Sequence, residues 1–208
     1  MIIAVDGPTA SGKGTIARAL AAHYGLPHLD TGLLYRAVGW QVRLDGGDPN
    51  LPADALAGVD FPESLLENPA LRSEDAGGFA SRVSVHPAVR HALFERQRAF
   101  AAQPGGAVLD GRDIGTIIAP DAEAKLFVTA STAARALRRW KEMVERGEKH
   151  TLAVIEDDLR RRDERDRTRA EAPLRAAADA ILLDTSELGR EEAIAAAIAA
   201  VERAVARG

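Results

Sequence analysis

Short apolar runs alternate along the chain with longer segments in which apolar residues recur at helical spacing. The short runs cover residues 2–5, 28–30, 107–110, 124–129 and 180–183, and they have the length of buried parallel strands. The segments between them predict helices over 15–24, 31–43, 87–102, 132–145 and 191–205, with a further, largely polar helix starting at Thr151. Strands that alternate with helices predict an α/β fold, in which helices cover both faces of a five-stranded parallel sheet as three α/β/α layers.

The pattern is weak from residue 50 to residue 78, where Pro52, Pro62 and Pro69 divide the chain into short pieces. We expect a mobile insert here, within one domain that spans residues 1–208. Two helix starts carry candidate caps. Thr31 is expected to cap the helix that follows it, and Ser131 or Thr132 the helix that reaches residue 145.

Composition narrows the class of protein. Aromatic residues make up only 4% of the chain, so Ala, Leu, Val and Ile must fill the core. The chain has no cysteine, which excludes a disulfide framework and a cysteine zinc site. Together with the lack of a signal-peptide pattern, this favours the cytoplasm. No run is apolar and long enough for a membrane span, and a net charge of −4 gives no reason to expect nucleic-acid binding. We expect a monomer.

A glycine-rich turn follows the first predicted strand. Residues 7–13 read Gly-Pro-Thr-Ala-Ser-Gly-Lys and match G-x-x-x-x-G-K, the phosphate-binding P-loop of nucleoside triphosphatases, between a strand and a helix. Backbone N–H groups and the helix N-terminus would face the phosphates, and Lys13 would reach the β and γ oxygens. Gly14 stands where the motif usually has Ser or Thr, so Thr15 is the candidate hydroxyl for Mg²⁺. A chance glycine turn is the plainer alternative.

A second motif overlaps the first. Residues 12–17 also fit the dinucleotide-binding pattern G-x-G-x-x-A, and Asp30 lies about where a ribose-binding acid would follow. The first glycine of that pattern should come directly after the strand, whereas Gly12 comes seven residues after Val5. The position therefore favours a triphosphate loop.

Of the 27 cations only Lys13, Lys125, Lys141 and Lys149 are lysine. Arginine grips phosphate through a planar fork, although genome base composition can produce the same bias. The arginines gather at 30–36, at 110–115 directly after a strand, and at 160–169, where Arg162, Asp166 and Arg169 share one helix face. Phosphoryl transfer needs such cations, and an acid such as Asp110 at a strand end can hold magnesium or its waters.

Each cluster also has a plainer interpretation. The 160–169 segment could be a solvated, salt-bridged helix, and 110–113 a turn with capping acids. Tyr35 could face the core. Arg135, Arg138 and Arg139 could face ATP or simply pair with Glu142.

Five motifs together resemble those of bacterial cytidylate kinases. They are Gly-Pro-Thr-Ala-Ser-Gly-Lys-Gly-Thr at 7–15, Leu-Asp-Thr-Gly-Leu-Leu-Tyr-Arg at 29–36, Arg-Gln-Arg-Ala-Phe at 96–100, Asp-Gly-Arg-Asp-Ile-Gly-Thr at 110–116 and Arg-Asp-Glu-Arg-Asp-Arg-Thr-Arg-Ala at 162–170. The resemblance spans nearly the whole chain. It implies the nucleoside monophosphate kinase fold, with a monophosphate-binding insert at about 45–85 and a closing lid at about 145–170. Some family members carry a longer insert with a β-hairpin, which we expect to be missing here.

The resemblance also implies the reaction, ATP + (d)CMP = ADP + (d)CDP, and a role for individual residues. ATP and Mg²⁺ would be bound by Gly7, Pro8, Thr9, Ala10, Ser11, Gly12, Lys13, Gly14, Thr15 and Arg139. Catalysis would rest on Lys13, Asp110, Arg112 and Arg162. CMP would be bound by Thr31, Tyr35, Arg36, Ser81, Arg90, Arg112, Asp113, Asp166 and Arg169, of which Arg36, Arg112 and Arg169 would hold its phosphate and Asp166 its ribose.

The base assignment makes independent chemical sense. Cytosine offers an amino donor at N4 beside acceptors at N3 and O2, so Asp113 can accept while Arg90 and Ser81 donate. Two alternatives stay open. The acceptor could be AMP, UMP or a small metabolite, or the chain could be a nucleotide-dependent regulatory module. Against a GTP switch, no guanine-reading Asn/Thr-Lys-x-Asp motif is present.

Overall fold

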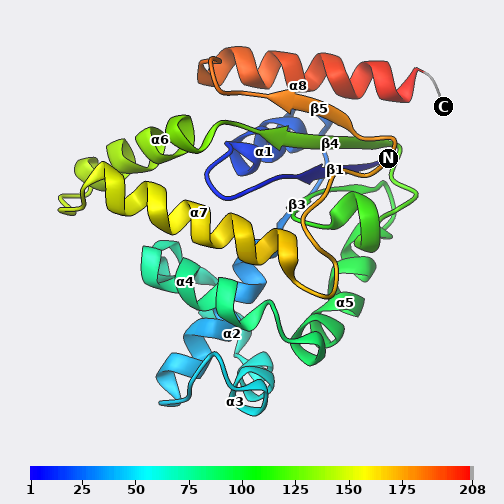
Figure 1. Cartoon of the computed structure of the whole chain (residues 1–208). Coiled ribbons are helices and arrows are strands. Elements are labelled where there is room, and N and C mark those ends of the chain that lie inside the picture. The colour runs from blue at the N-terminus through cyan, green and yellow to red at the C-terminus, as the bar shows by residue number, and fades with distance from the viewer. Residues whose placement is uncertain (207–208) are drawn as a thin grey trace.

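The computed structural model describes residues 1–206 and confirms the predicted five-stranded parallel sheet. Its strands are β1 (Ile2–Asp6), β2 (His28–Asp30), β3 (Ala107–Gly111), β4 (Ala124–Thr129) and β5 (Ile181–Asp184). They lie in the order β2-β3-β1-β4-β5, so the chain adds β2 and β3 on one side of β1 and then β4 and β5 on the other (Figure 1). In such sheets ligands bind at the carboxyl ends of the strands, near the point where the order reverses.

Helices cover both faces of the sheet. Alternate residues of β1 divide between two cores. Ile3 and Val5 pack with the apolar faces of α1 (Lys13–Tyr24) and α8 (Arg190–Val205). Ala4 faces the other way, in a core that includes Ala101 of α5 (Pro87–Ala101). The small alanines of α8 allow this helix to lie close to the sheet, which explains how a chain with few aromatic residues fills its interior.

The 45–85 segment is helical where the sequence predicted little structure. After α2 (Thr31–Leu44) come α3 (Pro52–Ala57), single 3₁₀ turns at Gly58–Asp60, Glu63–Glu67 and Pro69–Arg72, and α4 (Glu74–Val83). Pro52 and Pro69 each stand at the start of a helical piece, where the missing N–H costs nothing, so two of the prolines begin structure instead of breaking it. No strand occurs in this segment, in line with the expected lack of a hairpin.

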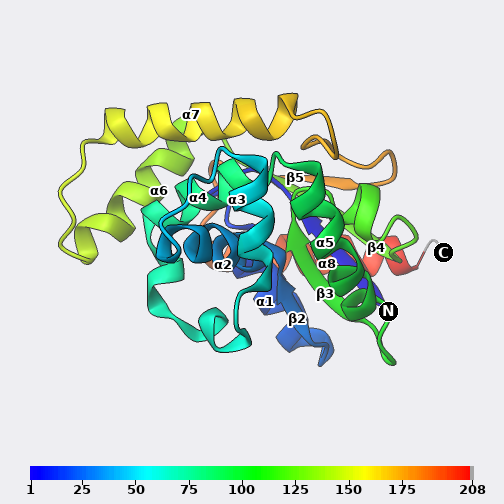
Figure 2. The same ribbon diagram turned by 90° about the horizontal axis from the view of Figure 1, so that it is seen from below.

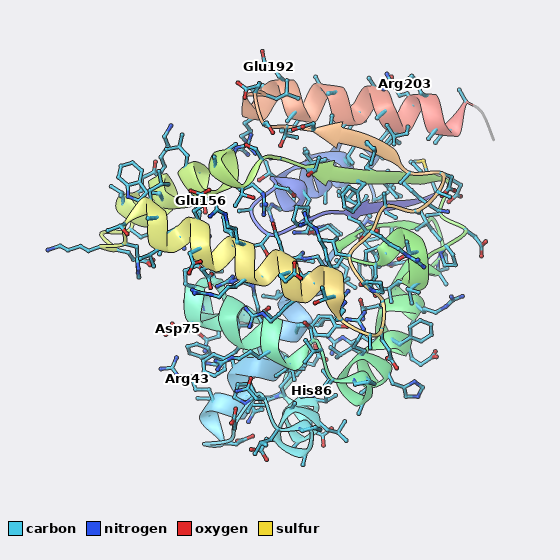
Figure 3. The ribbon with its side chains drawn as sticks, viewed as in Figure 1. Arg43, Asp75, His86, Glu156, Glu192 and Arg203 are labelled. Carbon is cyan, nitrogen blue, oxygen red and sulfur yellow. The ribbon has the colours of Figure 1, made fainter. Side chains whose placement is uncertain are left out.

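This segment builds a third core with α2 as its centre. Leu34, Val38 and Val42 of α2 pack against Leu71 and Val83, all nearly inaccessible to solvent. Gly39 allows α4 to approach closely, because a Cβ there would lie 2.7 Å from the Cβ of Phe79. Figure 3 shows Arg43 and Asp75 at this junction, where they form a long ion pair of 3.9 Å.

Two predicted caps are settled by the structure. The prediction that Thr31 caps α2 is wrong: the side chain of Asp30 accepts from Leu33 N, and the Thr31 hydroxyl donates to Asp110 O at 2.8 Å. Of the two candidates for α6 (Thr132–Glu145), Ser131 is the cap, accepting from Ala134 N at 3.2 Å.

A helical hairpin projects from the carboxyl end of the sheet. It consists of α6 and α7 (Leu152–Thr168), and α7 crosses above α4, as two perpendicular views show (Figures 1 and 2). Within residues 1–206 no helix combines the length and apolarity needed to cross a lipid bilayer.

Candidate active site

One cavity of about 710 Å³ lies at the carboxyl edge of the sheet, lined from the phosphate loop, β3, α2, α4, α6 and α7. Its wall holds most of the residues that the sequence singled out: Thr9, Ala10, Ser11, Gly12, Lys13, Gly14, Thr15, Thr31, Tyr35, Arg36, Ser81, Arg90, Asp110, Arg112, Asp113, Arg139, Arg162, Asp166 and Arg169. Gly7 and Pro8 are not on the wall. Gly7 instead allows the loop to lie close to the backbone of residue 128, because a Cβ there would lie 2.0 Å from Val128 O.

The phosphate loop has the backbone of an anion cradle. Ala10 and Gly12 adopt left-handed conformations, with φ of 61° and 87°, and α1 begins directly after them. Alternation of this kind turns successive N–H groups toward one concave side. The Ser11 hydroxyl is buried and has no hydrogen-bond partner among the described residues, so it is available to a ligand.

Lys13 lies within the loop, where its Nζ donates to Pro8 O at 3.4 Å. Burial lowers the pKa of Lys13 to about 8, and the nearby Arg112 adds to the effect. A carbonyl is a weak substitute for an anion, and a phosphate entering here would restore the favourable environment of the ammonium.

Asp110, at the end of β3, is buried beside the start of α1. Its Oδ1 lies 2.7 Å from His28 Nε2, while its Oδ2 would be 3.6 Å from a Cβ on Gly14. No group of three acids or histidines in residues 1–206 could hold a metal ion unaided. Thr15 and Asp110 fit a magnesium ion that arrives with nucleotide phosphates, since Mg²⁺ takes few protein ligands beside them.

The guanidinium groups of Arg36, Arg139 and Arg162 lie close together opposite the loop. Arg36 donates to Leu71 O and Ser73 O, and Gly77 is the point where Arg36 and Arg162 come together, because a Cβ there would lie 3.2 Å from one and 2.7 Å from the other. Burial lowers the pKa of Arg36 to about 10, with repulsion from Arg162 and Arg139 contributing. Neighbouring guanidinium groups repel one another, so such a cluster is well suited to a polyanion.

Glu74, the first residue of α4, is the carboxylate that this cluster shares. Arg162 Nη2 donates to its Oε2 at 2.9 Å, and Arg139 pairs with its other oxygen. Burial raises the pKa of Glu74, but Arg162 and Arg139 outweigh burial and the net pKa is lowered. Sequence reasoning missed this residue, because its partners are 65 and 88 positions away.

Arg112 connects three parts of the site. Its Nε donates to Asp166 Oδ2 on α7 at 2.7 Å, and its Nη2 donates to Thr9 Oγ1 in the phosphate loop, also at 2.7 Å. The turn after β3 is therefore tied to the loop on one side and to the helical hairpin on the other. The plainer interpretation of 110–113, a turn with capping acids, does not account for these contacts.

A second buried set lies at the α5 end of the cavity. Arg90 pairs with Asp113, and Arg169 Nη2 lies 3.7 Å from the other oxygen of Asp113. Ser81 Oγ, on the same wall, is buried, and nothing within residues 1–206 forms a hydrogen bond with it. Tyr35 meets both of its predicted alternatives, since its ring belongs to the α2 core and also lines the cavity.

The α7 helix divides into two kinds of position. Arg160 pairs with Glu156 at 2.6 Å on the exposed side, as the salt-bridge interpretation predicts. Arg162, Asp163 and Asp166 are buried. For these residues, a solvated helix is the wrong description.

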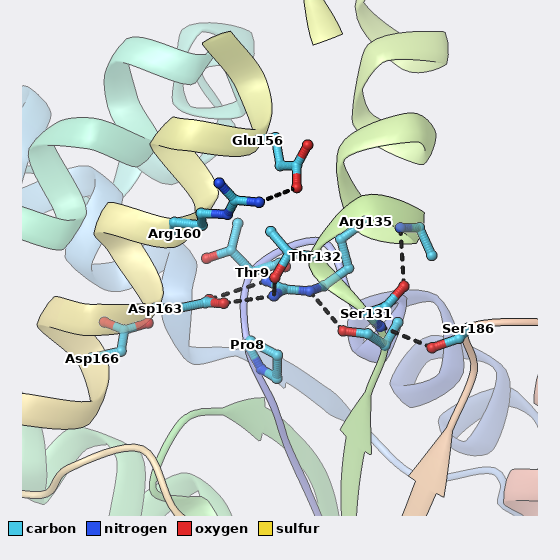
Figure 4. Close-up of polar contacts among 12 residues, drawn as sticks. Pro8, Thr9, Ser131, Thr132, Arg135, Glu156, Arg160, Asp163, Asp166 and Ser186 are labelled. Carbon is cyan, nitrogen blue, oxygen red and sulfur yellow. Dashed lines mark hydrogen bonds and ion pairs between the residues drawn. The ribbon is translucent and has the colours of Figure 1, made fainter. Parts of the chain in front are cut away.

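Both predicted roles of Arg135 are wrong. Only 2% exposed, it neither lines the cavity nor pairs with Glu142, but donates to both oxygens of Asp163 and to Thr9 O (Figure 4). This buried pair fastens α6 to α7 and to the phosphate loop. Arg139 does pair with Glu142, at 2.9 Å, and also lines the cavity. Arg138 lines the cavity too, and donates to Thr185 Oγ1.

Comparisons with known proteins agree over nearly the full chain. The family model described as "Cytidylate kinase" matches residues 3–203. A cytidylate kinase from Xanthobacter autotrophicus is 56% identical, with 97% of each chain covered. One from Caulobacter sp. is also 56% identical, over 99% of this chain and 96% of the relative. Among solved structures, an uncharacterized protein from Eubacterium ventriosum has a TM-score of 0.55 at 15% identity, covering 97% of this chain and 98% of that one, which supports the fold.

Proposed function

The chain belongs to the cytidylate kinase family, and from this premise we propose how its cavity moves the γ-phosphoryl group of ATP onto the phosphate of CMP or dCMP. The observation that carries the proposal is the joining of three features in one cavity. They are an anion-binding loop, a cluster of arginines opposite it, and a buried Arg90–Asp113 pair beside the cluster.

ATP occupies the loop side. The N–H groups of residues 9–14 and Lys13 hold its phosphates, with Thr15 and Asp110 toward the magnesium ion that accompanies them. The far end of the cavity, lined by Arg138, Thr185 and Leu188, has room for the nucleoside. Bound magnesium supplies charge neutralisation and orients the phosphates.

CMP occupies the side of α2, α4 and α5, so that the 45–85 segment serves as the monophosphate-binding insert. Its phosphate is held by Arg36, Arg112 and Arg169, and its ribose by Asp166. Asp113 accepts from the cytosine amino group while Arg90 and the unpartnered Ser81 hydroxyl donate. Uracil would bring an acceptor against Asp113 with no proton between them, a mismatch of about 1–3 kcal/mol.

Transfer needs positioning and charge more than acid–base chemistry. A phosphate oxygen of CMP is already ionised, so it attacks the γ phosphorus in line without a general base, while the bond from that phosphorus to the β–γ bridging oxygen breaks and ADP leaves. Lys13, Arg112 and Arg162 neutralise charge on the transferring group, and residues 145–170 close as a lid that excludes water. In this assignment, the nucleotide phosphates balance the positive charge of the cavity's arginines, which the neighbouring carboxylates balance only in part.

Initial rates of ADP formation test the proposal, with CMP, dCMP, UMP, AMP and shikimate as acceptors. We expect the two cytidylates to be preferred. Preference for another acceptor would contradict the base site. Nucleotide binding with no ADP formed in the presence of CMP would point to a regulatory module.

A further inference from the structure

Asp6 is a buried carboxylate that the mechanism above does not use. It is the last residue of β1, only 4% exposed, and pairs in register with Gly111 of β3 on one side and Phe127 of β4 on the other. Among residues 1–206 no lysine or arginine forms an ion pair with it. Burying an unpaired carboxylate is unfavourable, and here burial raises the pKa of Asp6 to about 7 despite two backbone hydrogen bonds.

Both oxygens of Asp6 hold one turn. Oδ1 accepts from Ile114 N and Oδ2 from Gly115 N, each at 2.8 Å. These are the first two residues of the π-helical turn Ile114–Ile118, which closes when Ile117 and Ile118 donate to Asp113 O. A neutral side chain could not accept from two N–H groups as symmetrically, which gives a reason for a carboxylate at this cost.

The turn carries the residues that face the acceptor. Arg112 and Asp113 stand between Gly111, fixed by its ladder with β1, and Ile114, fixed by Asp6. Asp6 is also bonded directly to Gly7, where the phosphate loop begins. Its carboxylate thus fixes the turn that reads the acceptor to the end of β1, the strand that leads into the phosphate loop.

We propose that Asp6 is a positioning residue that sets the preference for cytosine, acting through the 114–118 turn on Asp113 and Arg112. The proposal rests on the proposed function, in which Asp113 reads the base. Asp6 itself touches neither nucleotide: it does not line the cavity. Its effect should therefore appear in acceptor selectivity, not in ATP binding.

The test is Asp6→Asn, which keeps the shape but turns an NH₂ group toward one of the two N–H donors. We expect the ratio of kcat/KM for CMP over UMP to fall ~10-fold, the size of a lost contact of about 1.4 kcal/mol. The KM for ATP should change less than twofold. A ratio equal to that of the wild type would overturn the proposal.

A matched control separates positioning from loss of stability. Ile118 belongs to the same turn and is 4% exposed, so Ile118→Val weakens the packing of the turn without touching the carboxylate. It should lower the thermal midpoint and leave the CMP/UMP ratio unchanged. If Ile118→Val shifts the ratio as much as Asp6→Asn at a similar loss of stability, Asp6 is only structural.

A second variant keeps the proposal testable if Asp6→Asn does not fold. In Gly115→Ala the new Cβ would lie 3.5 Å from Asp6 Oδ2 and 3.3 Å from Lys125 Cδ, a small displacement of the same contact. We expect a smaller drop in the ratio, in the same direction. In the double variant Asp6→Asn/Asp113→Asn the two effects on selectivity should not add, because both act at Asp113. A wild-type enzyme that shows no cytidylate preference would instead refute the proposed function.

Discussion

Arg90 and Asp113 form an ion pair inside the cavity, with 9% and 7% of their side chains exposed. Because Arg169 approaches the same carboxylate, Asp113 stands between two cations. A buried pair of this kind holds each partner in a fixed orientation, and the removal of one partner leaves the other charge uncompensated.

Asp113→Asn should relax the choice between the pyrimidine bases. The amide can donate to uracil O4, so the CMP/UMP ratio of kcat/KM should fall ~5- to 150-fold, for a contact of about 1–3 kcal/mol. Competition assays with both acceptors measure this ratio. Asp157→Asn serves as control, since Asp157 is 59% exposed, pairs with Arg161 on the outer side of α7 and does not line the cavity. Unchanged selectivity in Asp113→Asn would remove this residue from the base site.

Arg112→Ala should lower kcat/KM ~100-fold for ATP and for CMP, as expected for the loss of about 3 kcal/mol of charge stabilisation in the transition state. The same change frees Thr9 and Asp166 of their shared partner. Steady-state kinetics measure the effect. Arg161→Ala is the matched control, since Arg161 is 62% exposed and its one ion pair among residues 1–206 is with Asp157 of its own helix. Its rates should stay within about twofold of the wild type. Equal losses of kcat/KM in both variants would contradict a role for Arg112 in stabilising the transition state.

ATP binding should take up a proton above pH 8. Without nucleotide, the burial-lowered pKa of Lys13 is about 8, so at pH 9 most of the amine is neutral. Bound phosphates favour the ammonium form and raise this pKa, so affinity should fall as the pH rises through 8. Isothermal titration calorimetry at pH 9 in two buffers of different ionisation enthalpy counts the proton. In Lys13→Arg the side chain stays charged and the uptake should vanish; the same count in both proteins would contradict the assignment.

Glu74→Gln should loosen the helical hairpin. Glu74 holds Arg139 of α6 and Arg162 of α7 from across the cavity, whereas Glu142 and Asp158 hold the same arginines from their own helices. Without the Glu74 charge, amide hydrogen exchange along α7 should quicken ~10-fold, for about 1.4 kcal/mol of lost opening energy. Glu142→Gln removes a partner within the hairpin and should leave exchange in α7 nearly unchanged. Similar protection in wild type and Glu74→Gln would show that this link does not hold the hairpin.

The sheet and most helices could be predicted from the sequence because their signals are local. A strand such as 124–129 and a helix such as 87–102 are marked by their own periodicity, and the structure moves their ends by a residue at most. The helices of the 45–85 segment could not be predicted, because proline begins a helix as readily as it interrupts one, and only the packing against α2 decides between them.

The residues of the site also divide into those with a local sequence signal and those without one. The phosphate loop and the Asp-Gly-Arg-Asp turn are contiguous motifs, so the sequence placed them correctly at the carboxyl edge of the sheet. Asp6, Glu74 and Asp163 have no such signal. Their partners are distant in the chain, and a carboxylate in a strand or on a charged helix resembles any solvated acid until the neighbouring elements are known.

The last part of the chain closes the far end of the cavity: Thr185, Leu188 and Ala193 line it, and Arg138 is fastened to Thr185. The 45–85 segment packs on α2 and completes its own core long before these residues are synthesised. On the ribosome, a nascent chain can therefore assemble the core of the insert early, whereas Asp166, Arg169 and the wall for the donor nucleoside follow only shortly before β5 pairs with β4 and α8 emerges. The cavity is complete only once β5 and α8 are in place.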